Sequence, residues 1–109
     1  MVKQGDIIVV DFDPQKGHEQ KGRRPAVVIS NNKFHKYTNL AILCPITNTD
    51  RPFPLHISLD NRTKTTGIVM CEQIKTVDIN TRKYRKIEKI PEDLLFEIID
   101  TVFSEIENN

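Results

Sequence analysis

The chain has 109 residues, of which 38% are hydrophobic and 28% are charged, a composition typical of one soluble globular domain spanning residues 1–109. No apolar run approaches the roughly 20 residues of a membrane-spanning helix. The N-terminal sequence MVKQGD leads directly into a predicted strand and lacks the pattern of a secretory signal. We therefore expect a cytoplasmic protein that has no membrane partner.

Charge is distributed unevenly along the chain, although the formal net charge is only +1. Residues 1–90 contain all 16 lysines and arginines and nine of the 15 acids, whereas residues 91–109 contain the other six acids and no basic residue. A basic body fits a polyanionic partner such as nucleic acid. An acidic tail that neutralises the body within the same molecule fits equally well, so charge alone does not choose between the two.

The first half of the chain predicts three strands. Ile7–Phe12 and Ala26–Ser30 are short and rich in β-branched residues, and Pro25 suits the start of the second strand. The loop between them is rich in charge and contains the strand breakers Asp13, Pro14, Gly17 and Gly22. Asn31–Asn39 is polar and predicts a turn with one short helical turn. Leu40–Ile46 is apolar throughout, which predicts a central strand covered on both faces.

The second half predicts further short strands. Leu55–Leu59 alternates between apolar and polar residues, as a half-buried strand does. Ile68–Val77 predicts either one long strand or two strands separated by a bend near Glu72. Asp78–Lys89 is polar and basic, with a weak strand around Ile87.

The chain ends in a predicted helix. Pro91 suits the first helical position, and Glu92 and Asp93 follow in the first turn, where acids favour the positive end of the helix dipole. Apolar residues then recur at helical period, namely Leu94, Leu95, Ile98, Ile99, Val102, Phe103 and Ile106. This stripe must pack on the sheet or on a second subunit. About six short strands and one terminal helix predict a mainly β protein, a small β-barrel with a C-terminal α-helix.

The two cysteines, Cys44 and Cys71, each lie in an apolar, strand-like run. We expect two buried thiols rather than a disulfide, because the chain carries no export signal. There is no CxxC pair and the three histidines are scattered, so no metal site and no other cofactor is expected.

The stretch from Val10 to Ser30, VDFDPQKGHEQKGRRPAVVIS, contains the pattern GxEQxGxRPxVV. With PIT at Pro45–Thr47, FPLHISL at Phe53–Leu59 and TGIVMCEQIKTVD at Thr66–Asp78, it resembles the signature of the MazF/PemK/Kid family of toxin endoribonucleases. The resemblance covers nearly the whole chain in the right order. It implies an SH3-like β-barrel, usually a homodimer, and neutralisation by a MazE-like antitoxin with an extended acidic tail. The implied activity is metal-independent, sequence-specific cleavage of single-stranded RNA such as mRNA, in which the 2′-hydroxyl attacks the phosphate and leaves a cyclic phosphate and a 5′-hydroxyl.

The resemblance assigns catalytic roles to Arg24 and Thr47. Arg24 matches the family's catalytic arginine in the RP step, and its planar guanidinium suits phosphate oxygens. Because an arginine side chain does not give up its proton near neutral pH, we expect phosphate binding and charge stabilisation from Arg24. Thr47 matches the catalytic threonine after the third strand, and its hydroxyl can donate to a phosphate oxygen.

His18 and Glu72 are the candidates for proton transfer. A histidine suits acid–base chemistry near neutral pH. Both residues resemble those of the Kid branch, but Met70 stands where that branch has an arginine two residues before the acid. His18 either assists the chemistry or contacts RNA, and Glu72 is either catalytic or an ordinary carboxylate at a strand end.

Further residues are expected to bind RNA, namely Lys16, Glu19, Gln20, Lys21, Arg23 and Gln73. The cations among them suit phosphates, and Glu19 and Gln20 either order the loop or read bases. His35 and His56 are given no functional role. The cluster Arg82, Lys83, Arg85 and Lys86 is interpreted as a solvated face, with the antitoxin's acidic tail as the alternative partner.

Two other functions compete with the ribonuclease. A CcdB-like toxin shares this barrel but binds DNA gyrase and has no enzymatic activity. A plain RNA-binding barrel without catalysis is the third hypothesis. The EQxGxRP motif, together with Arg24 and Thr47, favours the nuclease over both.

Overall fold

The computed structural model describes residues 1–12, 23–49 and 53–109. Its elements in chain order are β1 (Asp6–Asp11), β2 (Arg23–Val28), α1 (Asn32–Thr38), β3 (Leu40–Thr47), β4 (His56–Ser58), β5 (Ile68–Met70), the 3-10 helix η3 (Cys71–Gln73), β6 (Lys75–Asp78), β7 (Tyr84–Lys89) and α2 (Glu92–Ser104). A mainly β chain that ends in a helix confirms the expected fold class. None of the helices in these ranges has the length and apolar character needed to span a membrane.

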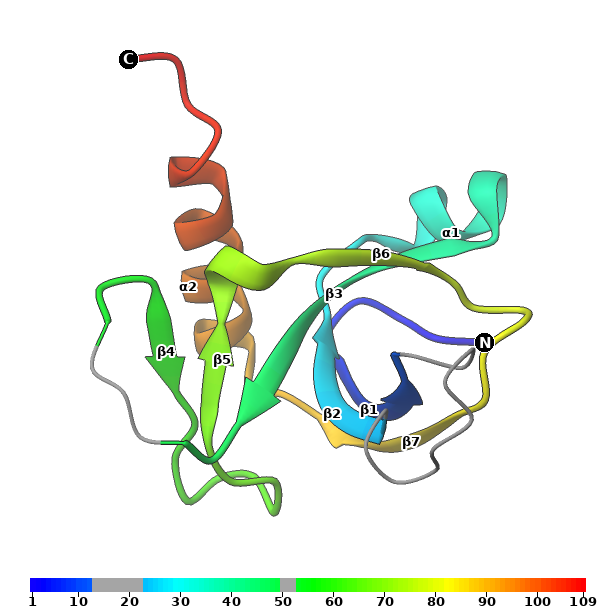
Figure 1. Cartoon of the computed structure of the whole chain (residues 1–109), viewed down its shortest axis with the longest axis horizontal. Coiled ribbons are helices and arrows are strands. Elements are labelled where there is room, and N and C mark those ends of the chain that lie inside the picture. The colour runs from blue at the N-terminus through cyan, green and yellow to red at the C-terminus, as the bar shows by residue number, and fades with distance from the viewer. Residues whose placement is uncertain (13–22, 50–52) are drawn as a thin grey trace.

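The seven strands form one antiparallel sheet in the order β4-β5-β3-β2-β1-β7, with β6 paired to β3 (Figure 1). β3 organises this arrangement, because one of its edges pairs with β2 and the other is shared between β6 and β5. The sheet curls around itself (Figure 1). Among the described strands, no pairing joins β4 to β7, so the curled sheet is left open at these two ends.

The two faces of β3 line two separate apolar cores. Cys44 and Ile46 belong to the core under α2, together with Val69 and Ile98. The alternate residues of β3 belong to a second core, made of Val2, Ile8, Val10, Ala26, Val28, Ala41, Leu43, Val77 and Ile79. Because both faces of β3 are covered over most of its length, its sequence is apolar from Leu40 to Ile46, as expected. Both cysteines are buried and free, which confirms their prediction as buried thiols.

Several predicted boundaries were wrong. β2 begins at Arg23 rather than after Pro25, so Arg23 and Arg24 lie in the strand and Pro25 lies opposite Val9 of β1. Of the two readings of Ile68–Val77, the one with a bend is confirmed: η3 separates β5 from β6. The weak strand near Ile87 is the full strand β7.

Helix α1 is longer than the single turn predicted from sequence. The side chain of Asn31 caps it by accepting a hydrogen bond from the backbone N–H of Phe34 at 2.9 Å. Asn39 ends it in the left-handed conformation, with a φ of 59°. Buried His35 ties the helix to the sheet through Ser30.

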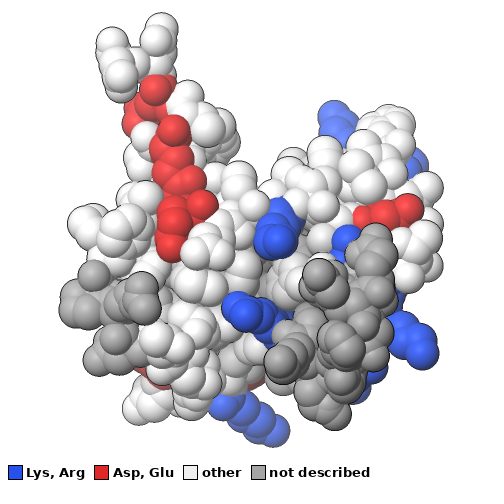
Figure 2. Space-filling model, viewed as in Figure 1, with Lys and Arg blue, Asp and Glu red and all other residues white. Residues whose placement is uncertain are grey.

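The apolar stripe of α2 divides between two environments. Leu94, Leu95 and Ile98 are buried against the sheet, whereas Phe103 and Ile106 are exposed. Acidic side chains form a column along α2, while most of the blue cations on the same face lie away from that column, with smaller red patches near the right and lower edges (Figure 2). The acidic end of the sequence therefore forms an acidic strip on this face of the molecule.

Candidate functional site

The pairing of β2 with β3 brings Arg24 and Thr47 together. Ala26 lies opposite Pro45 in this antiparallel ladder. Continuing the same register by two residues sets Arg24 opposite Thr47, and directly opposed side chains share one face of a sheet. Two residues 23 positions apart in sequence thus come to lie side by side at the end of the two strands.

The next two strands add His56 to the same face. Thr47 lies opposite Ile68 of β5, and Met70, two residues further along β5, lies opposite His56 of β4. Side chains two residues apart along a strand point to the same face. The intervening residues Ile46, Val69 and Ile57 point to the other face and belong to the core under α2.

These side chains surround a cavity of about 250 Å³. Its lining residues are Arg24, Thr47, Thr49, His56, Met70, Glu72 and Gln73. Of the residues singled out from sequence, Arg24, Thr47, Glu72 and Gln73 therefore meet at one place. Glu72 and Gln73 enter from η3, which follows β5 directly. The bend that interrupts the strand therefore positions the acid at the cavity.

His56 and Glu72 form a pair at the wall of this cavity. The distance between His56 Nε2 and Glu72 Oε2 is 3.1 Å, with side chains 10% and 26% exposed. Within the described part of the chain, Glu72 Oε1 is buried and has no hydrogen-bond partner. A buried carboxylate oxygen without a partner is costly, so it is a candidate acceptor for a ligand hydroxyl.

The surroundings of the pair are partly aromatic and partly acidic. The ring of Phe53 is tilted against that of His56, with 5.0 Å between their centroids, and Phe53 is 47% exposed. Burial, and then the charge of Glu72, raise the pKa of Glu105, which follows the end of α2. The guanidinium of Arg24 makes no hydrogen bond or ion pair with any described residue and so is available to an anion.

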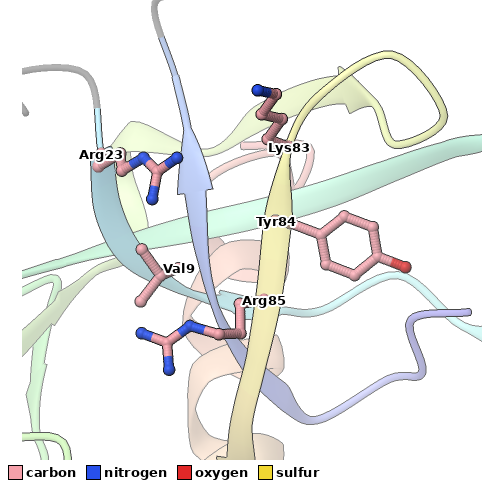
Figure 3. Close-up of a pocket in the computed structure, with 5 residues that line it drawn as sticks. All are labelled: Val9, Arg23, Lys83, Tyr84 and Arg85. Carbon is pink, nitrogen blue, oxygen red and sulfur yellow. The ribbon is translucent and has the colours of Figure 1, made fainter. Parts of the chain in front are cut away.

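The remaining predicted residues lie elsewhere. His18, Lys16, Glu19, Gln20 and Lys21 fall outside the described residues. Arg23 does not join the cavity of Arg24, because neighbouring residues of a strand point to opposite faces. It lines a second cavity with Val9, Lys83, Tyr84 and Arg85 (Figure 3). No group of three or more His, Cys, Asp or Glu side chains within residues 1–12, 23–49 and 53–109 is arranged to hold a metal ion.

A family model described as the PemK-like, MazF-like toxin of type II toxin-antitoxin systems matches residues 3–104. The chain belongs to this family. It is 34% identical over 102 residues to an endoribonuclease PemK of Escherichia coli, an alignment that covers 90% of this chain and 77% of that protein. The resemblance seen in the GxEQxGxRPxVV stretch and the later motifs is thereby confirmed.

Solved structures of the family have the same fold. A crystal structure of MazF from Deinococcus radiodurans matches with a TM-score of 0.84 at 30% identity, covering 96% of both chains. A MazE–MazF crystal structure from the same organism matches with a TM-score of 0.83 at 23% identity, covering 99% of this chain and 97% of that chain. The fold expected from the resemblance, a MazF-type β fold with a C-terminal helix, is confirmed.

His56 lines the candidate cavity, although sequence reasoning gave it no functional role. The alternation of FPLHISL places it on the polar face of its strand, opposite to the apolar Leu55, Ile57 and Leu59. That alternation is a local signal and carries no information about neighbouring strands. Only the order β2-β3-β5-β4 brings His56 to the cavity that Arg24 lines.

Proposed function

We propose that this chain is an endoribonuclease toxin that cleaves single-stranded RNA by attack of the 2′-hydroxyl on the neighbouring phosphate. The observation that carries the proposal is the convergence of Arg24, Thr47, His56 and Glu72 on one cavity. RNA brings its own nucleophile, so the enzyme has to bind the phosphate, stabilise charge on its oxygens and move two protons. The four side chains are chemically suited to these tasks.

Arg24 and Thr47 act on the phosphate in this proposal. The guanidinium is a permanent cation with a fork of N–H donors that matches two phosphate oxygens. The Thr47 hydroxyl already accepts a hydrogen bond from the backbone N–H of Thr49 at 3.2 Å, which leaves its own hydrogen for a ligand. Together they stabilise the negative charge that develops as the 2′-oxygen bonds to phosphorus, so the proposed reaction is metal-independent.

Glu72 and His56 move the protons. Glu72 Oε1 accepts the proton of the 2′-hydroxyl, while Oε2 holds the imidazole of His56. The new bond joins the 2′-oxygen to phosphorus, and the bond from phosphorus to the 5′-oxygen breaks. The pair returns one proton to the departing 5′-oxygen, so the products are a cyclic phosphate and a 5′-hydroxyl and the enzyme ends with the protons it began with. His18 stays a candidate for assisting this chemistry or contacting RNA.

Base recognition is assigned to residues around the cavity. Phe53 offers an exposed aromatic face beside His56, and unstacked RNA bases stack on such faces. Gln73 lines the cavity and presents an amide that can donate and accept hydrogen bonds. Lys16, Glu19, Gln20 and Lys21 remain proposed RNA contacts on the strength of the motif alone.

We propose that the active protein is a cytoplasmic homodimer. An apolar cavity of about 250 Å³ lies between the last turns of α2 and the sheet, lined by Ile29, Ser30, Ile42, Ile74, Ile99, Val102, Phe103 and Ile106. Exposed Phe103 and Ile106 extend this apolar surface, and a second copy of the chain would cover it. Phe103→Glu is expected to yield a monomer in sedimentation, whereas a dimer unchanged by this variant would move the interface elsewhere.

A MazE-like antitoxin is the proposed protein partner. A MazF chain of this fold was crystallised with MazE, and the acidic tail expected of such an antitoxin would compete with RNA for the cations of the site. The gyrase-binding alternative is not favoured, because the relative reported above is named an endoribonuclease and a gyrase binder has no need of this cavity.

The variant Arg24→Ala tests the function. Removing one donor that stabilises developing charge lowers the rate about 10²- to 10³-fold, so we expect single-turnover RNA cleavage to fall by at least that factor. Lys36→Ala removes an exposed cation of α1 and serves as the matched control, with wild-type cleavage expected. Thermal melting and sedimentation establish that both variants are folded and assembled. Cleavage by Arg24→Ala at the wild-type rate would contradict the assignment.

A further inference from the structure

Three cations surround the second cavity, on the face of β2 opposite to Arg24. Arg23 of β2, Arg85 of β7 and Lys83, just before β7, line about 130 Å³ together with Val9 and Tyr84. Figure 3 shows Arg23 and Arg85 on either side of Val9, whereas the ring of Tyr84 points away to the other side of β7. This cavity shares no lining residue with the proposed cleavage cavity.

Strand register explains why the cations gather there. Val9 of β1 lies opposite Arg85 of β7, and Asp11 lies opposite Arg23 of β2. Residues 9 and 11 of one strand point to the same face, so Arg23 and Arg85 stand on that face too. The backbone N–H of Asp11 donates to the carbonyl of Lys83 at 3.3 Å, which brings Lys83 beside the same row. The positions of these three cations are therefore set by strand pairing.

Among the described residues, these three cations differ from their neighbours in having no acidic ion-pair partner. Lys86 and Lys89 both pair with Asp6, at 3.4 and 3.5 Å. Arg82 donates to the carbonyl of Asp11 at 2.9 Å. Within the described part of the chain, the side chains of Arg23, Lys83 and Arg85 form no ion pair or hydrogen bond. Asp11 stands on the same face, so the cluster keeps a net positive charge after that carboxylate is counted.

We propose that this cluster binds a backbone phosphate of the RNA substrate, at a nucleotide outside the cleavage cavity. The inference rests on the proposed function. Guanidinium groups bind phosphates bidentately, and phosphate contacts position a nucleic acid without reading its sequence. Arg23 and Arg24 are consecutive, only about 3.3 Å apart along the strand. An RNA strand that crosses the end of β2 therefore meets the cleavage cavity on one face and the cluster on the other.

Binding of uncleavable RNA tests this subsite. The probes are fluorescent 2′-O-methyl oligonucleotides of four and twelve nucleotides centred on the mapped cleavage sequence, measured by anisotropy between 50 and 200 mM salt. Losing one exposed phosphate contact weakens binding about two- to fivefold and lowers the salt slope of a single strand by about 0.7. We expect both effects for Arg85→Ala and Lys83→Ala with the twelve-nucleotide probe and neither with the four-nucleotide probe.

Two further variants make the test discriminating. Asp11→Asn removes the carboxylate that lies opposite Arg23 in the register and is expected to tighten binding of the long probe, a gain that loss of fold does not produce. Lys33→Ala on α1 removes an exposed cation far from the row in sequence and is expected to leave the salt slope unchanged.

The outcomes separate this inference from the proposed function. Equal weakening of both probes by Arg85→Ala, or no change in either, would overturn the subsite while cleavage of RNA by the wild type still supports the nuclease. If Arg85→Ala bound RNA normally but bound an acidic antitoxin peptide more weakly, the cluster would be a site for that peptide. The proposed contact with an RNA phosphate would then be rejected. Absence of any RNA cleavage by the wild type would instead overturn the proposed function.

Discussion

His35 and His56 lie in two different regions of the molecule, and each imidazole is paired with a different kind of polar side chain. Each imidazole is almost enclosed and contacts a polar side chain through its Nε2 atom. His35 Nε2 lies 2.6 Å from Ser30 Oγ, which also accepts the backbone N–H of Ile42 at 2.9 Å. His56 Nε2 lies 3.1 Å from Glu72 Oε2. Ser30 Oγ makes its hydrogen bonds to other parts of the fold. Glu72, in contrast, lines a cavity, and its Oε1 has no hydrogen-bond partner among the described residues.

The two histidines therefore differ in their surroundings, and we use this difference to assign them different roles. Because Ser30 Oγ accepts from Ile42, its hydrogen is free to donate to His35, and the chain of bonds ties α1 to Ser30, which follows β2, and to β3. We infer that His35 stabilises the fold and that His56 serves the reaction. The predictions below separate stability from cleavage at each histidine.

His56→Gln is expected to have the largest effect. General acid–base catalysis contributes about 10²- to 10⁴-fold, so the single-turnover cleavage rate should fall within that range. The glutamine keeps a polar contact to Glu72, so the melting temperature should stay near that of the wild type. Normal RNA cleavage by this variant, or a loss of cleavage that is explained by unfolding, would contradict a role of His56 in the reaction.

His35→Ala is expected to do the reverse. It removes a buried side chain and a buried hydrogen bond, which costs about 2–4 kcal/mol of unfolding free energy. Below its lowered melting temperature, the variant should cleave RNA at the wild-type rate. Urea unfolding and single-turnover kinetics on the same samples check both halves. A large loss of cleavage by a still folded His35→Ala protein would place His35 in the mechanism.

The aromatic neighbours of the two histidines give a matched pair. Phe53 lies 5.0 Å from His56 and Phe34 lies 6.4 Å from His35, measured between ring centroids. Stacking of a base on an aromatic side chain is worth about 1–3 kcal/mol. Phe53→Ala should therefore weaken binding of uncleavable RNA, whereas Phe34→Ala should not. Equal RNA affinity for both variants would remove Phe53 from the proposed base contacts.

Acid should destabilise the protein through His35. Burial lowers the pKa of His35 below its ordinary value of 6.5. The unfolded chain then takes up a proton at a higher pH than the folded one, so stability present above pH 6.5 is lost as the pH falls toward the folded-state value. Urea unfolding at pH 7.5 and 5.5 should show a larger loss for the wild type than for His35→Gln. Identical losses would mean that His35 is not the titrating group.

Much of the fold could be predicted from local sequence patterns. The apolar run of β3 and the apolar residues in the first turns of α2 indicated which segments are buried, because both patterns follow the faces that are covered. β7 was underestimated because, among the described strands, it is an edge strand that pairs with β1 alone, and its charged residues carry little apolar periodicity. The start of β2 was misplaced because Pro25 was treated as a strand start, yet it is accommodated within the strand opposite Val9.

The candidate site was only partly predictable for a different reason. Arg24, Thr47 and Glu72 were found through motifs that resemble a known family. The position of His56 at the cavity, and the placement of Arg23 and Arg24 on opposite faces of the sheet, depend on strand order and register. Both bring together residues that are far apart in the chain. Local alternation assigns a side chain to a face but does not say which strands lie beside it.

Incubation of the purified chain with a long single-stranded RNA in EDTA, followed by mapping of the RNA ends, tests the central claim most directly. The cavity of Arg24, Thr47, His56 and Glu72 predicts discrete cuts that leave 5′-hydroxyl and cyclic phosphate ends. Intact RNA after incubation with folded protein, free of any bound antitoxin, would contradict a metal-independent ribonuclease and return the gyrase-binding alternative to consideration.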